Sequence, residues 1–237
     1  MMDKKRFPGK PPLLAPSILA ADFLKLGVQL GELKENGVRY VHFDVMDGHF
    51  VPSISFGMPV LASVRKDPEL FIDAHLMITD PGRYIKAFAD SGADLITIHM
   101  EASGDVGKDI ESIHDLGCLA GLSVKPGTPV SDVTPYIRDL DLLLIMTVEP
   151  GFGGQAYLPE SDERIREAVR LRDEAGSRCL IEVDGGIKAQ NVKRVLDAGA
   201  EVIVAGTAVF GGDIAGNIRD FNRVFNPVST GQGEKPV

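Results

Sequence analysis

One pattern recurs along the sequence from Leu13 onward: a short apolar run, a turn rich in Gly, Pro or Asp, and a longer segment of helical period. The phrases SGADLITI at 91–98 and AGAEVIVA at 198–205 are near copies of one junction between a helix end and a strand. Strands that alternate with helices form parallel sheets, because each parallel strand needs a crossover to return to the same edge. The repetition therefore predicts a parallel sheet covered by helices.

Eight apolar runs are predicted as strands, at residues 13–19, 40–45, 70–77, 95–99, 119–124, 142–148, 179–183 and 202–205. Apolar residues at helical spacing predict helices between them, for example at 22–35, 81–90 and 161–174. Eight such units in 237 residues favour a closed (β/α)8 TIM barrel over an open doubly wound α/β sheet. The open sheet stays as the alternative, although no G-x-G-x-x-G motif follows the first strand.

The pattern continues from 13 to 225 without a Pro/Ser-rich linker or a block of charge, so we expect one barrel domain over these residues. Residues 1–12 are basic and proline-rich, and residues 226–237 are polar, so both segments are expected to be flexible. We expect no secretory signal and no membrane span, because no apolar run is long enough.

The net charge and the cysteine content limit the possible binding partners and the expected cellular compartment. The formal net charge of −9 argues against nucleic acid or an anionic membrane as the main partner. It allows a small phosphorylated ligand, since backbone N–H groups can hold a phosphate in an acidic protein. Cys118 and Cys179 lie in apolar strand-like runs, and we interpret both as buried thiols of a reducing, cytoplasmic compartment.

The stretch YVHFDVMDGHFVPS at 40–53 begins as an apolar strand and ends as a polar loop. Successive strand side chains alternate, so His42, Asp44 and Met46 share one face while Phe43 and Val45 share the other. An imidazole and a carboxylate two positions apart can bind one divalent metal ion. A hydrogen-bonded core histidine beside a capping aspartate is the alternative for this segment alone.

Two further strand ends supply matching ligands. The third predicted strand ends in DAHLM, with His75, and the seventh ends in IEVDGG, with Asp184. A barrel brings these two residues to the same mouth as His42 and Asp44. Two imidazoles and two carboxylates suit one Zn²⁺, Fe²⁺, Mn²⁺ or Co²⁺ ion, so the sequence predicts a divalent metal site.

The remaining histidines are weaker candidates. His99 ends the fourth predicted strand, His49 lies in the loop after the second, and His114 lies in a helix. Methionines at or near strand ends are predicted mainly to pack, and also to exclude water beside the metal. These methionines are Met46, Met77 and Met146.

Glycine-rich loops follow the last three strands, as EPGFGGQ, DGG and AGTA. Glycine lets the backbone approach an anion closely, and the loops after strands seven and eight are the usual phosphate site of such barrels. We therefore predict a phosphate cradle at Gly153, Gly154, Gly185, Gly186, Gly206 and Thr207.

The motifs HFDVMDGHFVPS, DAHLM, MTVEPGFGGQ, EVDGGI and AGTAVF, in this order, resemble the ribulose-phosphate 3-epimerase family. The resemblance covers about residues 13–225. It implies a barrel enzyme that interconverts D-ribulose 5-phosphate and D-xylulose 5-phosphate with one divalent metal ion. The expected partner is thus a phosphorylated ketose.

By this resemblance, Asp44 and Asp184 are metal ligands that also act as the catalytic acid and base. His42 and His75 complete the metal set, and His75 contributes to substrate binding. Ser17 in APSIL matches a substrate-contacting serine, and the three methionines and the loop glycines complete the binding set. Inversion of the carbon next to a ketone passes through an enediolate. A metal ion can stabilise its negative charge, and two carboxylates on opposite sides can transfer the protons.

Two positions depart from the family pattern, since Ser53 and Glu149 stand where many members have asparagine. Both flank the motifs and affect the expected loop hydrogen bonds rather than the metal set. The loop at 149–157 is expected to close over the substrate as a lid.

Three other functions stay open. The first is a 3-epimerase of another ketose phosphate, such as D-allulose 6-phosphate. The second is a decarboxylase of the orotidine-phosphate type, whose Asp-x-Lys-x-x-Asp signature is absent from the sequence. The third is a non-catalytic sugar-phosphate-binding barrel. The sequence also leaves a homo-oligomer open.

Overall fold

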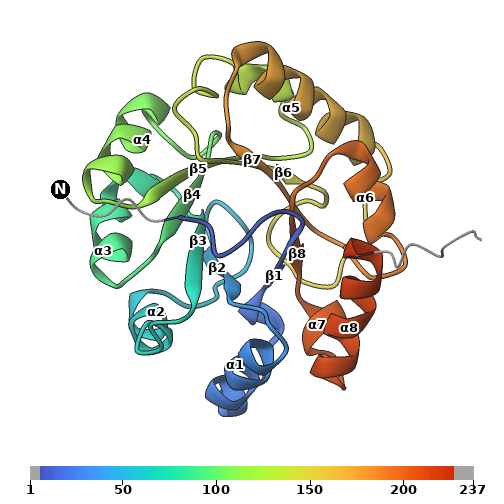
Figure 1. Ribbon diagram of the computed structural model, residues 1–237. Helices are drawn as coiled ribbons and strands as arrows, with labels where there is room; N and C mark the ends of the chain where they lie inside the picture. Colours follow the sequence, from blue (N-terminus) through green and yellow to red (C-terminus); the bar gives the residue numbers. More distant parts are fainter. Residues whose placement is uncertain (1–5, 227–237) are drawn as a thin grey trace, which may run out of the picture.

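The computed structural model describes residues 6–226 and forms a ring of parallel strands inside a ring of helices (Figure 1). The strands are β1 (Leu13–Pro16), β2 (Tyr40–Met46), β3 (Phe71–Met77), β4 (Leu95–His99), β5 (Leu119–Val124), β6 (Leu142–Met146), β7 (Leu180–Asp184) and β8 (Val202–Ala205). The helices are α1 (Leu26–Glu35), α2 (Met58–Val64), α3 (Ile85–Asp90), α4 (Val106–Asp115), α5 (Ser161–Ala175), α6 (Val192–Ala198), α7 (Thr207–Phe210) and α8 (Ile214–Phe225). Short 3-10 turns are η1 (Ile18–Ala20), η2 (Phe23–Lys25), η3 (Pro81–Arg83) and η4 (Val130–Val133).

All eight strands pair in parallel, in the order β1-β8-β7-β6-β5-β4-β3-β2. A single parallel bridge between Ser17 and His42 joins β1 to β2 and closes the circle. The predicted (β/α)8 barrel is therefore confirmed, and the open sheet is excluded. The narrow β1–β2 seam lies beside the predicted metal ligands of β2.

The eight predicted strands all form, and the differences lie at their ends. The first ends at Pro16 because Ser17 begins the η1 turn, where its hydroxyl accepts from the Leu19 N–H. The sixth ends at Met146 rather than 148. The helix predicted from residue 22 begins as the η2 turn, with Asp22 accepting from the Leu24 N–H, and becomes α-helical at Leu26. The short polar side chains of Ser17 and Asp22 accept hydrogen bonds from nearby backbone N–H groups. A short 3-10 turn therefore forms at each position in place of regular strand or α-helix.

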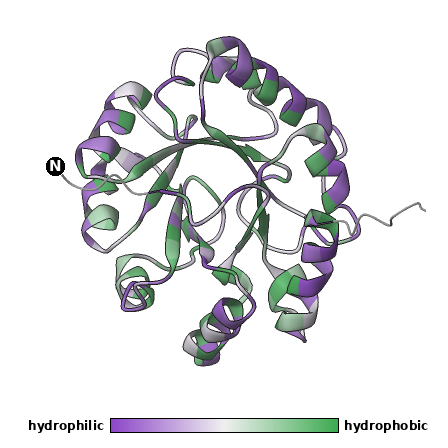
Figure 2. Cartoon of the chain, viewed as in Figure 1, coloured by the Kyte–Doolittle hydropathy of each residue, from purple (hydrophilic) through white to green (hydrophobic). Residues whose placement is uncertain are grey.

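Apolar side chains form two concentric layers. One layer lies between the strands and the helices and contains Phe43 and Val45, the residues predicted on the outward face of β2. The other fills the barrel interior below the site with residues such as Tyr40, Leu95 and Leu142. Figure 2 shows hydrophobic strands surrounded by helices that turn hydrophilic faces outward.

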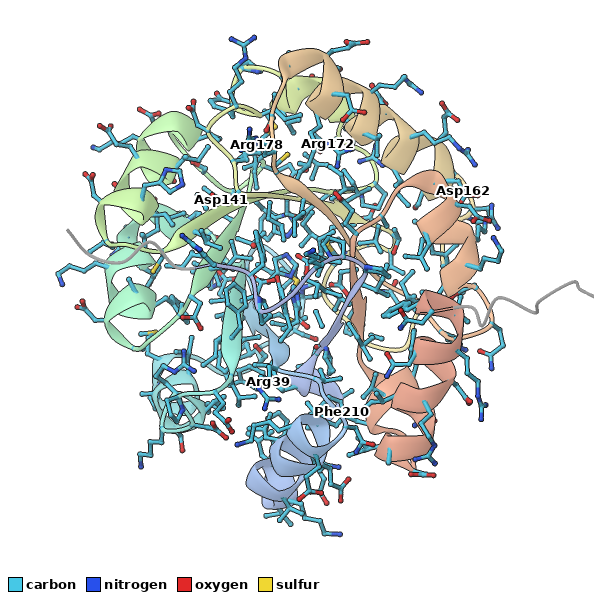
Figure 3. The ribbon with its side chains drawn as sticks, viewed as in Figure 1. Arg39, Asp141, Asp162, Arg172, Arg178 and Phe210 are labelled. Carbon is cyan, nitrogen blue, oxygen red and sulfur yellow. The ribbon has the colours of Figure 1, made fainter. Side chains whose placement is uncertain are left out.

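Charged side chains lie around the outside of this ring. Arg172 of α5 pairs with Glu201 at 2.6 Å, and Asp162, at the start of the same helix, lies on the periphery (Figure 3). The Arg172–Glu201 pair is half-buried, but ion pairs near the surface contribute little stability, so the barrel depends mainly on its two apolar layers.

Residues 6–12 lead into the lower end of the barrel, where the Phe7 ring lies 5.7 Å from the Phe71 ring. We predicted flexible segments at 1–12 and 226–237. Most of these residues, 1–5 and 227–237, lie outside the described part of the chain, so their flexibility stays a prediction. Both cysteine side chains are buried, as predicted, and Cys118 Sγ donates to the Ala93 carbonyl. Among residues 6–226, no helix has the length and apolar character needed to cross a membrane.

Gly121 of β5 faces the barrel interior opposite Thr97, and an added Cβ would lie 2.3 Å from the Thr97 hydroxyl. We therefore expect Gly121→Ala to lower the free energy of unfolding by about 1–3 kcal/mol, measured by urea denaturation. The matched change Gly31→Ala lies in α1 with no atom within 4 Å of the new Cβ. It should raise stability by about 0.5–1 kcal/mol, and equal effects at the two sites would contradict this account of the interior.

Candidate active site

Four side chains with metal-binding groups meet at the carboxyl ends of three strands. His42 and Asp44 come from β2, His75 from β3 and Asp184 from β7, and one ligand atom of each lies within 4.8 Å of the others. Asp44 Oδ1 lies 3.0 Å from His75 Nδ1 and 3.2 Å from His42 Nε2. The two imidazole nitrogens are 3.2 Å apart. The barrel thus brings together all four predicted ligands.

Asp44 is held as a carboxylate by its neighbours. The Ser17 hydroxyl donates to Asp44 Oδ2 at 2.5 Å across the β1–β2 seam. Burial acts to raise the pKa of Asp44, but the positive charge and hydrogen bond of His42, with those of His75, outweigh it. The pKa of Asp44 therefore lies well below its usual range, and the group is ionised at neutral pH.

Asp184 shows the opposite shift. Burial and the negative charge of Asp44 raise the pKa of Asp184 to about 6, although His42 and His75 act against them. One carboxyl is thus strongly acidic, and the other titrates near neutrality. Two carboxyls whose pKa values are pushed apart can act as a base and an acid in one site.

The far side of His42 is held by a second carboxylate. His42 Nδ1 lies 2.9 Å from Asp73 Oδ2, and Asp73 also accepts from Tyr40 Oη at 3.3 Å and from Thr97 Oγ1 at 3.0 Å. Burial acts to lower the pKa of His42, but Asp44 and Asp73 on its two sides raise it well above its usual value. The arrangement therefore favours a positive charge at His42 or beside it.

A further acid, Glu182 of β7, lies beneath the site with its Oε1 atom 3.8 Å from His42 Nδ1. Burial, and then the charge of Asp73, raise the pKa of Glu182 well above its usual value. Neither Asp73 nor Glu182 was predicted as a site residue. The signal was present, because each stands two positions before a predicted ligand, His75 or Asp184, and therefore on the same strand face.

His99 is the other side chain that the sequence undervalued. Its Nε2 atom lies 2.9 Å from His75 Nε2, and its Nδ1 atom lies 3.3 Å from Glu101 Oε2. Burial lowers the pKa of His99 to about 4, so the ring is neutral at neutral pH. His49 is exposed in its loop, and His114 contacts Asp141 at 2.8 Å on the outside, so these two stand apart from the cluster.

A pocket of about 390 Å³ opens above the four ligands. The two histidines lie buried beneath it, and all other predicted site residues line it: Ser17, Asp44, Met46, Met77, Met146, Gly153, Gly154, Asp184, Gly185, Gly186, Gly206 and Thr207. Lys188, which follows the DGG loop and also lines the pocket, was not among the predicted site residues. The pocket wall therefore combines two acids with glycine loops and one lysine.

Close packing joins the glycine loops. A Cβ on Gly186 would lie 2.4 Å from the Tyr157 backbone nitrogen, and Gly186 has φ +67°. The loop after β7 and the loop after β6 can therefore meet only if residue 186 lacks a side chain. Within the latter loop, the Gln155 amide donates to the carbonyls of Glu149 and Phe152, at 2.6 and 3.0 Å.

The loop after β2 is anchored by Asp47. Its carboxylate accepts from the backbone N–H groups of His49, Phe50 and Thr79, at 2.8, 2.9 and 2.8 Å. The backbone of Ser53, one of the two departures from the family pattern, accepts from Gly48 N at 2.9 Å. Phe50 from this loop packs beside Met46 and Met77 over the site.

Comparison with known proteins identifies the family to which the chain is similar. Residues 13–210 match the model of the ribulose-phosphate 3 epimerase family. The chain is 45% identical to a ribulose-phosphate 3-epimerase of Bacillus subtilis over 199 residues, which cover 84% of this chain and 92% of that protein. A ribulose-phosphate 3-epimerase of Escherichia coli K12 is 44% identical, with 84% and 88% covered.

Solved structures of lower identity share the fold. KGPDC from Streptococcus mutans superposes with a TM-score of 0.69 at 15% identity, covering 93% of this chain and all of that one. A 3-hexulose-6-phosphate synthase superposes with a TM-score of 0.65 at 20% identity, covering 91% of this chain and all of that one. These likenesses support the barrel architecture alone.

Fold, strand-end acids and glycine loops together define a (β/α)8-barrel enzyme of the isomerase class. More narrowly, the chain belongs to the ribulose-phosphate 3-epimerase family, because the family model spans most of its length and relatives of that name are about 44% identical.

Asp47→Ala removes the acceptor of three backbone N–H groups, so the loop should open locally. We expect hydrogen exchange at His49, Phe50 and Thr79 to quicken about tenfold, which corresponds to about 1.4 kcal/mol. Burial acts to raise the pKa of Asp47, but the hydrogen bonds from the backbone N–H groups of Thr79, His49 and Phe50 together lower it. The stability that these hydrogen bonds give the loop is therefore fully present above the usual carboxyl pKa. It is lost as the pH falls through the lowered pKa of Asp47.

Protection factors at neutral and acidic pH measure this effect. The exposed Glu111→Ala serves as the control and should leave exchange unchanged. Equal protection in native and Asp47→Ala chains at neutral pH would contradict the anchoring role.

Proposed function

We propose that this enzyme interconverts D-ribulose 5-phosphate and D-xylulose 5-phosphate by inverting carbon 3, with one divalent metal ion bound at the cluster. The observation that carries the proposal is the meeting of His42, Asp44, His75 and Asp184 beneath a pocket with glycine loops at its other side. Family membership supports the pentose-phosphate substrate.

The donor set fits a divalent metal ion. Two imidazole nitrogens and two carboxylate oxygens lie close enough to share one ion, and this mixed set suits Zn²⁺, Fe²⁺, Mn²⁺ or Co²⁺. The acidic surroundings already favour a positive charge between Asp44 and Asp73. When bound, such an ion supplies Lewis-acid stabilisation of the negative charge that develops on the substrate oxygens.

The two aspartates carry out the proton transfers in this proposal. Inversion requires that one group removes the proton of carbon 3 from one face and that another returns a proton to the opposite face. Asp44 and Asp184 come from β2 and β7 and both line the pocket. Their pKa values are pushed in opposite directions, which supports a base and an acid that exchange roles with the direction of reaction.

The remaining lining residues position the sugar. The Ser17 hydroxyl, already bonded to Asp44, faces the reacting end, and Met46, Met77 and Met146 present apolar surface that limits water there. The glycine loops and Lys188 would hold the phosphate. Binding energy at the phosphate then fixes carbon 3 between the aspartates.

The loop at 149–157 is the proposed lid. Phe152 at its tip is 59% exposed, and a Cβ on Gly151 would lie 2.8 Å from the Pro52 ring of the β2 loop. The lid is thus packed at its base and free at its tip, which suits closure over a bound ligand.

A 3-epimerase acting on a hexulose phosphate such as D-allulose 6-phosphate is the second candidate, because the same cluster and cradle would serve it. The cytoplasmic location and a homo-oligomeric state stay predictions, as does the absence of nucleic-acid and membrane partners.

Turnover in heavy water tests the proposal. The native chain should convert D-ribulose 5-phosphate to D-xylulose 5-phosphate with deuterium at carbon 3, measured by NMR. Asp184→Asn removes one proton carrier and should lower the rate at least about 100-fold. A chelator should abolish turnover, and added Mn²⁺, Zn²⁺, Fe²⁺ or Co²⁺ should restore it.

Asp139→Asn, an exposed change of the same kind, should leave the rate unchanged. Preferred turnover of D-allulose 6-phosphate would favour the second candidate. A folded, metal-loaded native chain that turns over neither sugar would overturn the proposed activity.

Gly154→Ala tests the lid and the cradle. Gly154 has φ +76° and open space around a new Cβ, so the change strains the backbone, by about 1 kcal/mol, without a clash. We expect KM for the phosphorylated sugar to rise several-fold. Gly153→Ala, at a φ outside the left-handed region, should raise KM less, and Gly127→Ala, in an exposed loop, should not change it. An unaltered KM in Gly154→Ala would argue against both the lid and the cradle.

A further inference from the structure

We infer that Glu101 is a positioning residue that acts through His99 to fix the orientation and tautomer of His75, so that His75 presents the lone pair of Nδ1 to the metal. The inference rests on the metal site of the proposed function and assigns a role to two side chains outside it. Glu101 follows β4, and His99 is the last residue of that strand.

An unbroken line of contacts connects Glu101 to the site. Glu101 Oε2 lies 3.3 Å from His99 Nδ1, His99 Nε2 lies 2.9 Å from His75 Nε2, and His75 Nδ1 lies 3.0 Å from Asp44 Oδ1. Both imidazoles are fully buried, so water cannot replace the contact between them. Each ring nitrogen of the two histidines therefore has a defined partner.

The direction of the protons follows from Glu101. Its other oxygen, Oε1, accepts from the Lys125 backbone N–H at 2.7 Å and from the Thr128 hydroxyl. Burial opposes ionisation, but the hydrogen bonds from His99, Thr128 and Lys125 lower the pKa of Glu101 to about 2. Glu101 is thus a carboxylate that can only accept.

Because Glu101 accepts, His99 must carry its proton on Nδ1. A neutral imidazole with a proton on Nδ1 has a lone pair on Nε2, which then accepts from His75 Nε2–H. His75 in turn keeps its lone pair on Nδ1, the atom that faces Asp44 and His42. The opposite tautomer of His99 would place a second N–H against His75 and move the His75 proton toward the metal site.

The ring of His99 is also fixed in space. The Phe50 ring lies 4.9 Å from it, and the Lys125 ammonium lies 3.7 Å above the Phe50 ring. Arg164 donates to the carbonyls of Lys125 and Thr128, both at 2.8 Å, and so supports the segment that holds Glu101. Residues from the loops after β2, β4 and β5 thus converge on one imidazole.

His42 provides an internal comparison. Its Nδ1 atom contacts Asp73 directly, which leaves Nε2 for the metal. Carboxylate partners of metal-bound histidines orient the ring and increase its basicity, and their loss lowers metal affinity by about 10–100-fold. Glu101 has the corresponding relation to His75, with His99 interposed.

Zinc affinity of the purified full chain tests the inference by competition with a chromophoric chelator. Glu101→Ala should weaken Zn²⁺ binding by about 10–100-fold. Glu101→Gln keeps a carbonyl acceptor for His99 and should lose less, so it serves as the conservative rescue. Thr128→Val removes a donor to Oε1 but leaves Oε2, and should change the affinity less than about threefold.

Long-range ¹H–¹⁵N NMR of the histidine rings supplies a readout that general loss of stability would not produce. In the zinc-loaded native chain, His99 should be protonated on Nδ1 and His75 on Nε2. A His99 protonated on Nε2, or native zinc affinity in a folded Glu101→Ala chain, would overturn the positioning role while leaving the metal site in place. Failure of the native chain to bind Zn²⁺ would overturn the metal site and, with it, this inference.

Discussion

Ionisable side chains at the centre of an apolar barrel must be paired with one another, because an isolated buried charge costs several kcal/mol or more. In this chain the clustered groups are carboxyls and imidazoles on the inward faces of β2, β3, β4 and β7, the last of which is not adjacent to the other three in the sheet. The carboxyls are Asp44, Asp73, Glu182 and Asp184, and the imidazoles are His42, His75 and His99. The register of the parallel strands sets the spacing of these side chains, so the geometry of the site is fixed by strand pairing.

That constraint determines which atoms face the pocket. Asp73 occupies Nδ1 of His42, and His99 occupies Nε2 of His75, so each ring has one nitrogen left to face Asp44. The loop after β2 covers the cluster from above, held by the bonds of Asp47 to backbone N–H groups. A flexible ring in either position would leave the nitrogens of the proposed metal site without a fixed direction.

The sequence predicted the barrel, every strand and the meeting of His42, Asp44, His75 and Asp184, because alternation within strands and repetition between them follow directly from residue order. It did not identify Asp73, Glu182 or Lys188, and it undervalued His99. Their roles depend on which strands are neighbours and how far side chains reach, as in the contact of His75 with His99 across β3 and β4. One strand end and one helix start differed, where Ser17 and Asp22 cap short turns through local hydrogen bonds to the backbone.

The seam between β1 and β2 has a consequence for synthesis of the protein. β1 is paired along its length only with β8, which lies almost two hundred residues later, and it reaches β2 through one bridge beside Ser17. A chain still emerging from the ribosome therefore has β2 and β3 long before it has a secured Ser17. Asp44 of β2 remains without its fixed serine partner until the last strand is made, so the pocket is completed at the end of folding.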